Sequence, residues 1–225
     1  MTSIKTMSPE FFSFFKQLEE HNTREWFKAN KSRFDLSVKE PFENFVQDLI
    51  QKIQKVDSDF SELTAKECIF RIHRDVRFSK DKSPYKLHMG ALISPSGKKG
   101  MADKGFYLEV GLENIRLYTG LYQPSKETIE LVRDEILMNH ITFKKICDNK
   151  NFKTCFGSIR GDKNKRLSKE IMEFSSTEPL ILNKQWYVFK DFTQIESNDS
   201  NFSNQLIEVY KISLPFQKFL QKHSS

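Results

Sequence analysis

Residues 105–122, GFYLEVGLENIRLYTGLY, contain the pattern that decides the fold. Apolar side chains alternate with other residues on both sides of a short central segment, at Phe106, Leu108, Val110 and Leu112 and then at Ile115, Leu117 and Leu121. Such alternation indicates half-buried β-strands, and Gly111–Asn114 between them predicts a turn. We therefore predict a hairpin in which Glu109 faces Arg116 on the side opposite the apolar residues.

Two further strands are predicted upstream of this hairpin, at 70–78 and 87–94. In the second, Leu87, Met89, Ala91 and Ile93 alternate, and a turn follows at Ser94–Gly97. In the first, the apolar face consists of Phe70, Ile72, Val76 and Phe78, interrupted only by Arg74. The other face of this predicted strand is polar and carries Arg71, His73, Asp75 and Arg77.

The N-terminal part of the chain is predicted to be helical over most of residues 8–55. Ser8-Pro9-Glu10 is typical of a helix start, with a hydroxyl cap, a proline in the first turn and an acidic residue after it. Asn22-Thr23 predicts a second cap, and Pro41 predicts the start of a third helix. That helix keeps its apolar residues on one face, at Phe42, Phe45, Val46, Leu49, Ile50 and Ile53.

The C-terminal part mixes predicted helices with two short strands. Helices are expected from Pro124, after Asn139 and over Ser200–Leu220, with a kink or break at Pro215. Strands are expected at 152–159 and 186–192. No repeat or Gly/Ser linker separates these segments, so we predict one α+β domain over residues 1–225, with N-terminal helices, a central, mainly antiparallel sheet and C-terminal helices.

The composition is that of a water-soluble globular protein. Of the 225 residues, 38% are hydrophobic and 29% charged, and the mean hydropathy is −0.57. No segment approaches the ~20 apolar residues of a membrane span. The first eight residues lack the apolar core of a signal peptide, and the three cysteines form no C-x-x-C pair. We expect reduced thiols and a cytoplasmic location, with no membrane partner.

The net charge of +6 is concentrated in one part of the chain. Between Arg71 and Lys104 there are nine cations and three carboxylates, so this window alone accounts for the net charge. A concentrated basic segment attracts phosphates, nucleic acid or acidic proteins. A solvated, lysine-rich loop is the plainer interpretation, but arginines in a strand-like pattern fit it less well.

Neither metal nor kinase chemistry is predicted. The five histidines and three cysteines show no ligand spacing, so no metal site and no cofactor are expected. His73-Arg74-Asp75 matches the catalytic-loop tripeptide of protein kinases. That motif requires an asparagine where Lys80 stands, and it requires a glycine-rich loop that this sequence lacks.

Residues 70–90, FRIHRDVRFSKDKSPYKLHMG, together with residues 22–31, NTREWFKANK, resemble an uncharacterised bacterial and fungal family catalogued as domain of unknown function 2461. The resemblance is strongest at about residues 20–135. It implies a coherent fold and focuses attention on the long motif, but it implies no reaction. The family pattern often has other residues at His73 and His88, which implies that neither histidine is an obligatory acid or base.

The long motif is predicted to bind an anion. One carboxylate, Asp75, cannot neutralise both Arg71 and Arg77, so another carboxylate, such as Glu109, or a bound anion must compensate the remaining charge. Guanidinium, ammonium and hydroxyl groups suit phosphate oxygens. The predicted ligand-binding residues are Arg71, Arg74, Asp75, Arg77, Ser79, Lys80, Lys82, Tyr85 and Lys86.

The expected function is the binding of a phosphorylated or otherwise anionic small molecule. Three alternatives remain open at the sequence level: nucleic-acid binding, docking of an acidic protein, and phosphoryl or acyl chemistry with Asp75 or Tyr85 in proton transfer. The sequence identifies no catalytic residue and no oligomeric state.

Overall fold

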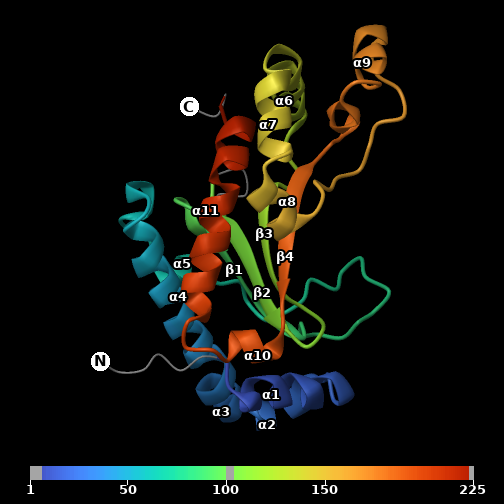
Figure 1. Cartoon of the computed structure of the whole chain (residues 1–225). Helices are drawn as coiled ribbons and strands as arrows, with labels where there is room; N and C mark the ends of the chain where they lie inside the picture. Colours follow the sequence, from blue (N-terminus) through green and yellow to red (C-terminus); the bar gives the residue numbers. More distant parts are fainter. Residues whose placement is uncertain (1–6, 100–103, 223–225) are drawn as a thin grey trace. The chain divides into compact units, whose positions relative to one another are not determined.

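A computed structural model describes residues 7–99 and 104–222. It confirms the α+β class: helices precede and follow a four-stranded antiparallel sheet with strand order β1-β2-β3-β4 (Figure 1). The four strands are β1 (His88–Ile93), β2 (Phe106–Gly111), β3 (Ile115–Leu121) and β4 (Trp186–Phe192). The bounds of β1, β2 and β3 agree closely with the strands predicted at 87–94 and in the hairpin of residues 105–122. Strand β4 begins and ends at the residues predicted for it, 186 and 192.

The predicted hairpin is confirmed in both turn and register. Gly111 N–H donates to the carbonyl of Asn114 at 2.9 Å, which closes a two-residue loop. This pairing places Glu109 directly across from Arg116. Both are half-buried, whereas their strand neighbours Leu108, Val110, Ile115 and Leu117 are buried on the other face of the sheet.

The chain forms two compact units, and each of β2 and β3 contributes residues to both. Of the described residues, 7–99, 107–117 and 191–207 belong to the first unit, and 104–106, 118–190 and 208–222 to the second. That residues 1–225 form one domain stays a prediction.

The first unit contains the predicted N-terminal helices. Ser8 precedes α1 (Pro9–Glu20), and Thr23 caps α2 (Arg24–Ala29) by accepting a hydrogen bond from Trp26 N–H. All six apolar residues predicted for the third helix are buried in α4 (Glu40–Gln54). A π-helical segment, η1 (Asp35–Lys39), joins α3 to α4 without a break. The helices of this unit, apart from the start of α11, are α1 (Pro9–Glu20), α2 (Arg24–Ala29), α3 (Lys31–Phe34), α4 (Glu40–Gln54), α5 (Ala65–Cys68) and α10 (Gln194–Ser197).

The second unit contains the remaining helices, and it corrects one prediction. The strand predicted at residues 152–159 is wrong, because the helix α8 (Lys150–Phe156) covers most of them. Asn149 caps this helix by accepting from Phe152 N–H at 3.1 Å, and Phe152 and Phe156 are buried one helical turn apart. Its helices are α6 (Lys126–Met138), α7 (His140–Cys147), α8 (Lys150–Phe156), α9 (Lys169–Phe174) and most of α11 (Phe202–Leu220), which continues through Pro215.

The strand predicted at 70–78 is wrong. We call residues 69–87 the arm; it leaves the sheet as a long loop between α5 and β1 (Figure 1). Isolated antiparallel bridges join Ile69 to Ala91 and His73 to Tyr85. Ile69 and His73 are four positions apart in the sequence, whereas their partners Ala91 and Tyr85 are six positions apart. The two bridges are therefore out of register with each other, and no regular ladder forms.

The predicted alternation nevertheless holds along part of the arm. Arg71, His73, Asp75 and Arg77 are exposed, and Ile72 between them is buried. Phe78, predicted on the apolar face, is 96% exposed. The hydrogen bond from Arg74 N–H to the Pro84 carbonyl is the last backbone pairing toward the tip of the arm, so no paired segment lies beside this ring.

Candidate functional site

The base of the arm is held by Asn22, from the second sequence motif. Its side-chain amide donates to the carbonyl of Tyr85 at 3.0 Å, and its oxygen accepts from Tyr85 N–H at 3.1 Å. The Tyr85 ring is buried and stacks on Phe27, with the ring centroids 4.1 Å apart. The two motifs therefore meet in space, and Tyr85 packs in the core.

The tip of the arm, residues 74–83, pairs two of its arginines internally. Arg77 forms two side-chain contacts with Asp75, Nε to Oδ1 at 2.9 Å and Nη2 to Oδ2 at 2.7 Å. Arg74 pairs with Asp81. The hydrogen bonds from Arg77 lower the pKa of Asp75 to about 2, and those from Ser83, followed by Arg74, lower the pKa of Asp81.

The remaining predicted residues of the tip have few partners. Lys82 Nζ donates to the carbonyl of Val76 at 3.0 Å. Ser79 is half-buried and Lys80 is exposed. Within the part of the chain that the structure describes, neither of these two side chains makes a hydrogen bond or an ion pair.

Arg71 and Lys86 form a second cationic group at the base of the arm. No carboxylate of residues 7–99 and 104–222 lies within salt-bridge distance of either side chain. The ammonium of Lys86 lies over the Phe70 ring, 5.7 Å from its centroid. Burial, and then the charge of Arg71, lower the pKa of Lys86, while Glu109 acts in the opposite direction.

The neighbouring face of the sheet adds a histidine and a carboxylate from adjacent strands. His88 Nε2 of β1 lies 3.8 Å from Glu109 Oε2 of β2. Burial, and then the charge of Lys86, lower the pKa of His88 to about 4, so its imidazole is neutral at pH 7. Burial raises the pKa of Glu109 against the opposing effects of Asn114 and Arg116.

Two glycines permit the close packing of this face. A Cβ at Gly90 would lie 2.3 Å from the Tyr107 hydroxyl oxygen, and a Cβ at Gly111 would lie 2.4 Å from the Cβ of His88. Arg116, across from Glu109, pairs with Asp191 of β4. We call Arg71, Lys86, His88 and Glu109 the basal site.

The structure thus divides the nine predicted site residues. Arg71 and Lys86 belong to the basal site, and Tyr85 packs in the core at the base of the arm. The other six, Arg74, Asp75, Arg77, Ser79, Lys80 and Lys82, belong to the tip. Sequence reasoning did not include His88 in the site and considered Glu109 only as a counter-charge. The signal that could have found both was present, because Lys86 and His88 alternate toward the hairpin face that carries Glu109.

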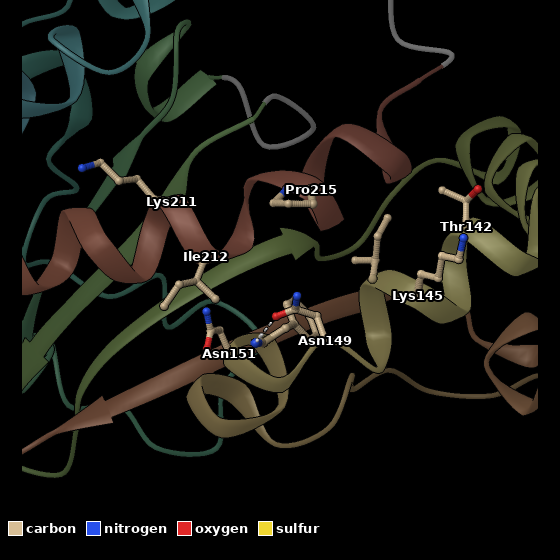
Figure 2. Close-up of a pocket in the computed structure, with 9 residues that line it drawn as sticks. Thr142, Lys145, Asn149, Asn151, Lys211, Ile212 and Pro215 are labelled. Atoms are coloured by element: carbon tan, nitrogen blue, oxygen red, sulfur yellow. Dashed lines mark hydrogen bonds between the residues drawn. The ribbon is translucent and has the colours of Figure 1, made fainter.

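The second unit contains a separate pocket of about 310 Å³, lined by residues of α7, α8 and α11 (Figure 2). Its polar groups come from Thr142, Lys145, Asn149, Asn151 and Lys211, and Pro215 lies at one side. Lys211 pairs with Glu208 at 2.7 Å. None of the sequence-predicted residues lines this pocket.

Chemically, the basal site offers two cations to an anion and an imidazole–carboxyl pair for proton exchange. Among the described residues, no cluster of three His, Cys, Asp or Glu side chains could hold a metal ion. The helices of residues 7–99 and 104–222 include none with the length and apolar character that a membrane span requires.

These features define a class: α+β proteins with a four-stranded antiparallel sheet and a cationic arm inserted before its first strand. Within that class, the chain belongs to the family described as "Conserved hypothetical protein (DUF2461)", whose model matches residues 10–219. This confirms the resemblance found in the sequence. Neither the search of curated proteins nor the search of solved structures found a match.

Proposed function

We propose that the arm and the basal site bind a phosphate-containing anion. Arg71 and Lys86 make the central contacts, and Arg77, Lys80 and Lys82 of the tip supply further positive charge. The guanidinium of Arg71 suits two-point contact with phosphate oxygens, whereas the ammonium of Lys86 acts as a point charge.

One observation carries this proposal. Burial, and then the charge of Arg71, lower the pKa of half-buried Lys86; Glu109 acts in the opposite direction without reversing this, and no described carboxylate forms a salt bridge with Lys86 or Arg71. Burying a cation beside another cation costs free energy unless an anion compensates them. A bound phosphate would remove this cost.

The proposal is tested by thermal unfolding with phosphate, sulfate or pyrophosphate, compared with chloride at equal ionic strength. A ligand at about 100 times its Kd stabilises a protein by about 2.7 kcal/mol, which corresponds to roughly 5–10 °C for a chain of this size. Arg71→Gln and Lys86→Met should abolish the anion-specific shift. Lys126→Gln, a surface change at the start of α6, should preserve it. Equal stabilisation by chloride in the wild-type protein would contradict the proposal.

The tip residues provide a second comparison. Arg77→Lys keeps the charge but loses the planar group, so it should weaken the anion-specific shift, whereas Lys82→Arg should largely keep it. Asp75→Asn releases Arg77 from its carboxylate and should strengthen anion binding. Weaker binding by Asp75→Asn would instead indicate that Asp75 positions the arginine.

A second candidate function, phosphoryl or acyl transfer, is favoured by the juxtaposition of His88 and Glu109. Asp75 is a poor base because Arg77 lowers its pKa to about 2, and the Tyr85 ring is buried, so proton transfer is better assigned to the His88–Glu109 pair. Hydrolysis of p-nitrophenyl phosphate or p-nitrophenyl acetate would test this. Activity that survives Glu109→Gln would argue against it.

A further inference from the structure

Phe78, at the tip of the arm, has the most exposed ring among the described residues, at 96%. Its one ring contact among the described residues is with Arg77, whose guanidinium carbon lies 5.9 Å from the ring centroid. Arg77 is itself held by Asp75. The ring therefore adds almost nothing to the packing of the free protein, although exposing a phenyl group to water is unfavourable.

The charges around this ring are mainly positive. Residues 71–86 contain six cations and two carboxylates, which gives the segment a net charge of +4. Both carboxylates are used in pairing Arg74 and Arg77. Lys80 and Lys82 follow Phe78 at two-residue intervals and are exposed, so the ring lies between cations on both sides along the chain.

We propose that the arm binds single-stranded nucleic acid, with phosphates on its cations and an unpaired base stacked on Phe78. This rests on the proposed function, because it identifies the phosphate-containing anion as a polynucleotide. An exposed aromatic ring among cations is the arrangement with which proteins hold single strands. Bases inside a duplex are already covered by their neighbours, so only an unpaired base offers its face.

The same features fit a membrane surface less well. A lone phenyl ring inserts little apolar area, and its exposed neighbours Arg77 and Lys80 are charged. Base stacking, in contrast, requires only one ring per base and is worth about 1–3 kcal/mol, or roughly 5–150-fold in affinity.

The experiment measures fluorescence anisotropy of labelled dT10 and U10 against the full chain at several salt concentrations. We expect binding that weakens with salt, because each neutralised phosphate of a single strand releases counterions. Phe78→Ala and Phe78→Leu should weaken binding about ten-fold, whereas Phe78→Trp should retain it, with quenching of the new indole on binding. Phe78→Ala should leave the salt slope unchanged, and Lys80→Gln with Lys82→Gln should reduce it.

The matched control is Ile195→Ala, which removes another exposed apolar side chain, 86% accessible, from α10. It should leave oligonucleotide binding unchanged. Because Phe78 is exposed, its variants should keep the wild-type melting temperature, so any loss of binding reports on the ring itself.

The inference is overturned if Phe78→Ala binds as tightly as the wild type, if a duplex binds equally well with the same dependence on Phe78, or if only anionic phosphatidylserine vesicles show that dependence. A phosphate-specific thermal shift without oligonucleotide binding would overturn the inference but leave the proposed function standing. If the wild-type protein shows neither the phosphate-specific thermal shift nor oligonucleotide binding, both the inference and the proposed function are contradicted.

Discussion

Gly111 determines how closely β1 and β2 approach beside the basal site. An added Cβ would lie 2.4 Å from His88 Cβ and 2.6 Å from the carbonyl oxygen of Leu87, which is a backbone atom. The atoms nearest to a Cβ at Gly90 would be those at the end of the Tyr107 side chain, not backbone atoms. The two glycines therefore differ in what must move.

We predict that Gly111→Ala lowers the free energy of unfolding by about 2–3 kcal/mol, as overpacking against a rigid strand does. Gly90→Ala should cost clearly less. Urea unfolding monitored by circular dichroism measures both values, and an equal cost at the two positions would be evidence against this reasoning.

His88 makes stability depend on pH. Its pKa falls from 6.5 to about 4 on folding, so the unfolded chain takes up the proton first as the solution is acidified. The contribution of His88 to the free energy of unfolding is fully present above about pH 6.5 and is lost as the pH falls toward 4. The charged groups that face His88 are Lys86, Glu109 and Glu113. All three are still present in a His88 variant, so a comparison with that variant isolates the titration of the imidazole.

We therefore predict that the wild type loses stability relative to His88→Asn between pH 7 and pH 4, by up to about 3 kcal/mol. Chemical denaturation at each pH provides the comparison. Parallel curves for the two proteins would show that His88 titrates normally in the folded state.

At the scale of elements, the arm depends on Asn22, which precedes α2 and bonds both backbone groups of Tyr85. Asn22→Ala leaves these partly buried groups unpaired and should destabilise the protein by about 1–3 kcal/mol. It should also speed proteolytic cleavage within residues 74–83, since the arm loses an anchor. Asn204→Ala, an exposed change in α11, serves as the control and should alter neither property.

Helix α11 contains a proline whose missing N–H leaves the Lys211 carbonyl without a helical donor. Pro215 is exposed, so replacing its ring loses little packing. Pro215→Ala should raise the free energy of unfolding by about 1–3 kcal/mol. The measurement is urea unfolding beside Lys218→Ala, which should change little. Destabilisation by Pro215→Ala would mean that α11 requires the proline's geometry.

At the scale of the whole molecule, a net charge of +6 attracts polyanions, but its position decides how strongly. Lys80→Gln with Lys82→Gln removes two charges from the arm, and Lys126→Gln with Lys218→Gln removes two from elsewhere. Both variants have a net charge of +4. We predict that the arm variant elutes from heparin at distinctly lower salt than the other. Identical elution would show that only the total charge matters.

The sequence by itself determined the α+β class, the hairpin register and the helix that begins near Pro41. Each of these follows from local rules, because side-chain alternation specifies a strand face and a spacing of three or four residues specifies a helix face. The sequence also located the cationic motif, since charge is a property of composition.

Only the tertiary structure decided what that motif becomes. The out-of-step bridges to residues 85 and 91 prevent a strand at 70–78 and leave Phe78 in solvent. The structure also separates Arg74 and Arg77, each with its own carboxylate, from Arg71 and Lys86, and it brings His88 beside Glu109. The physical reason is that charge pairing and burial depend on distances between segments far apart in the chain, which the periodicity of any one segment does not contain.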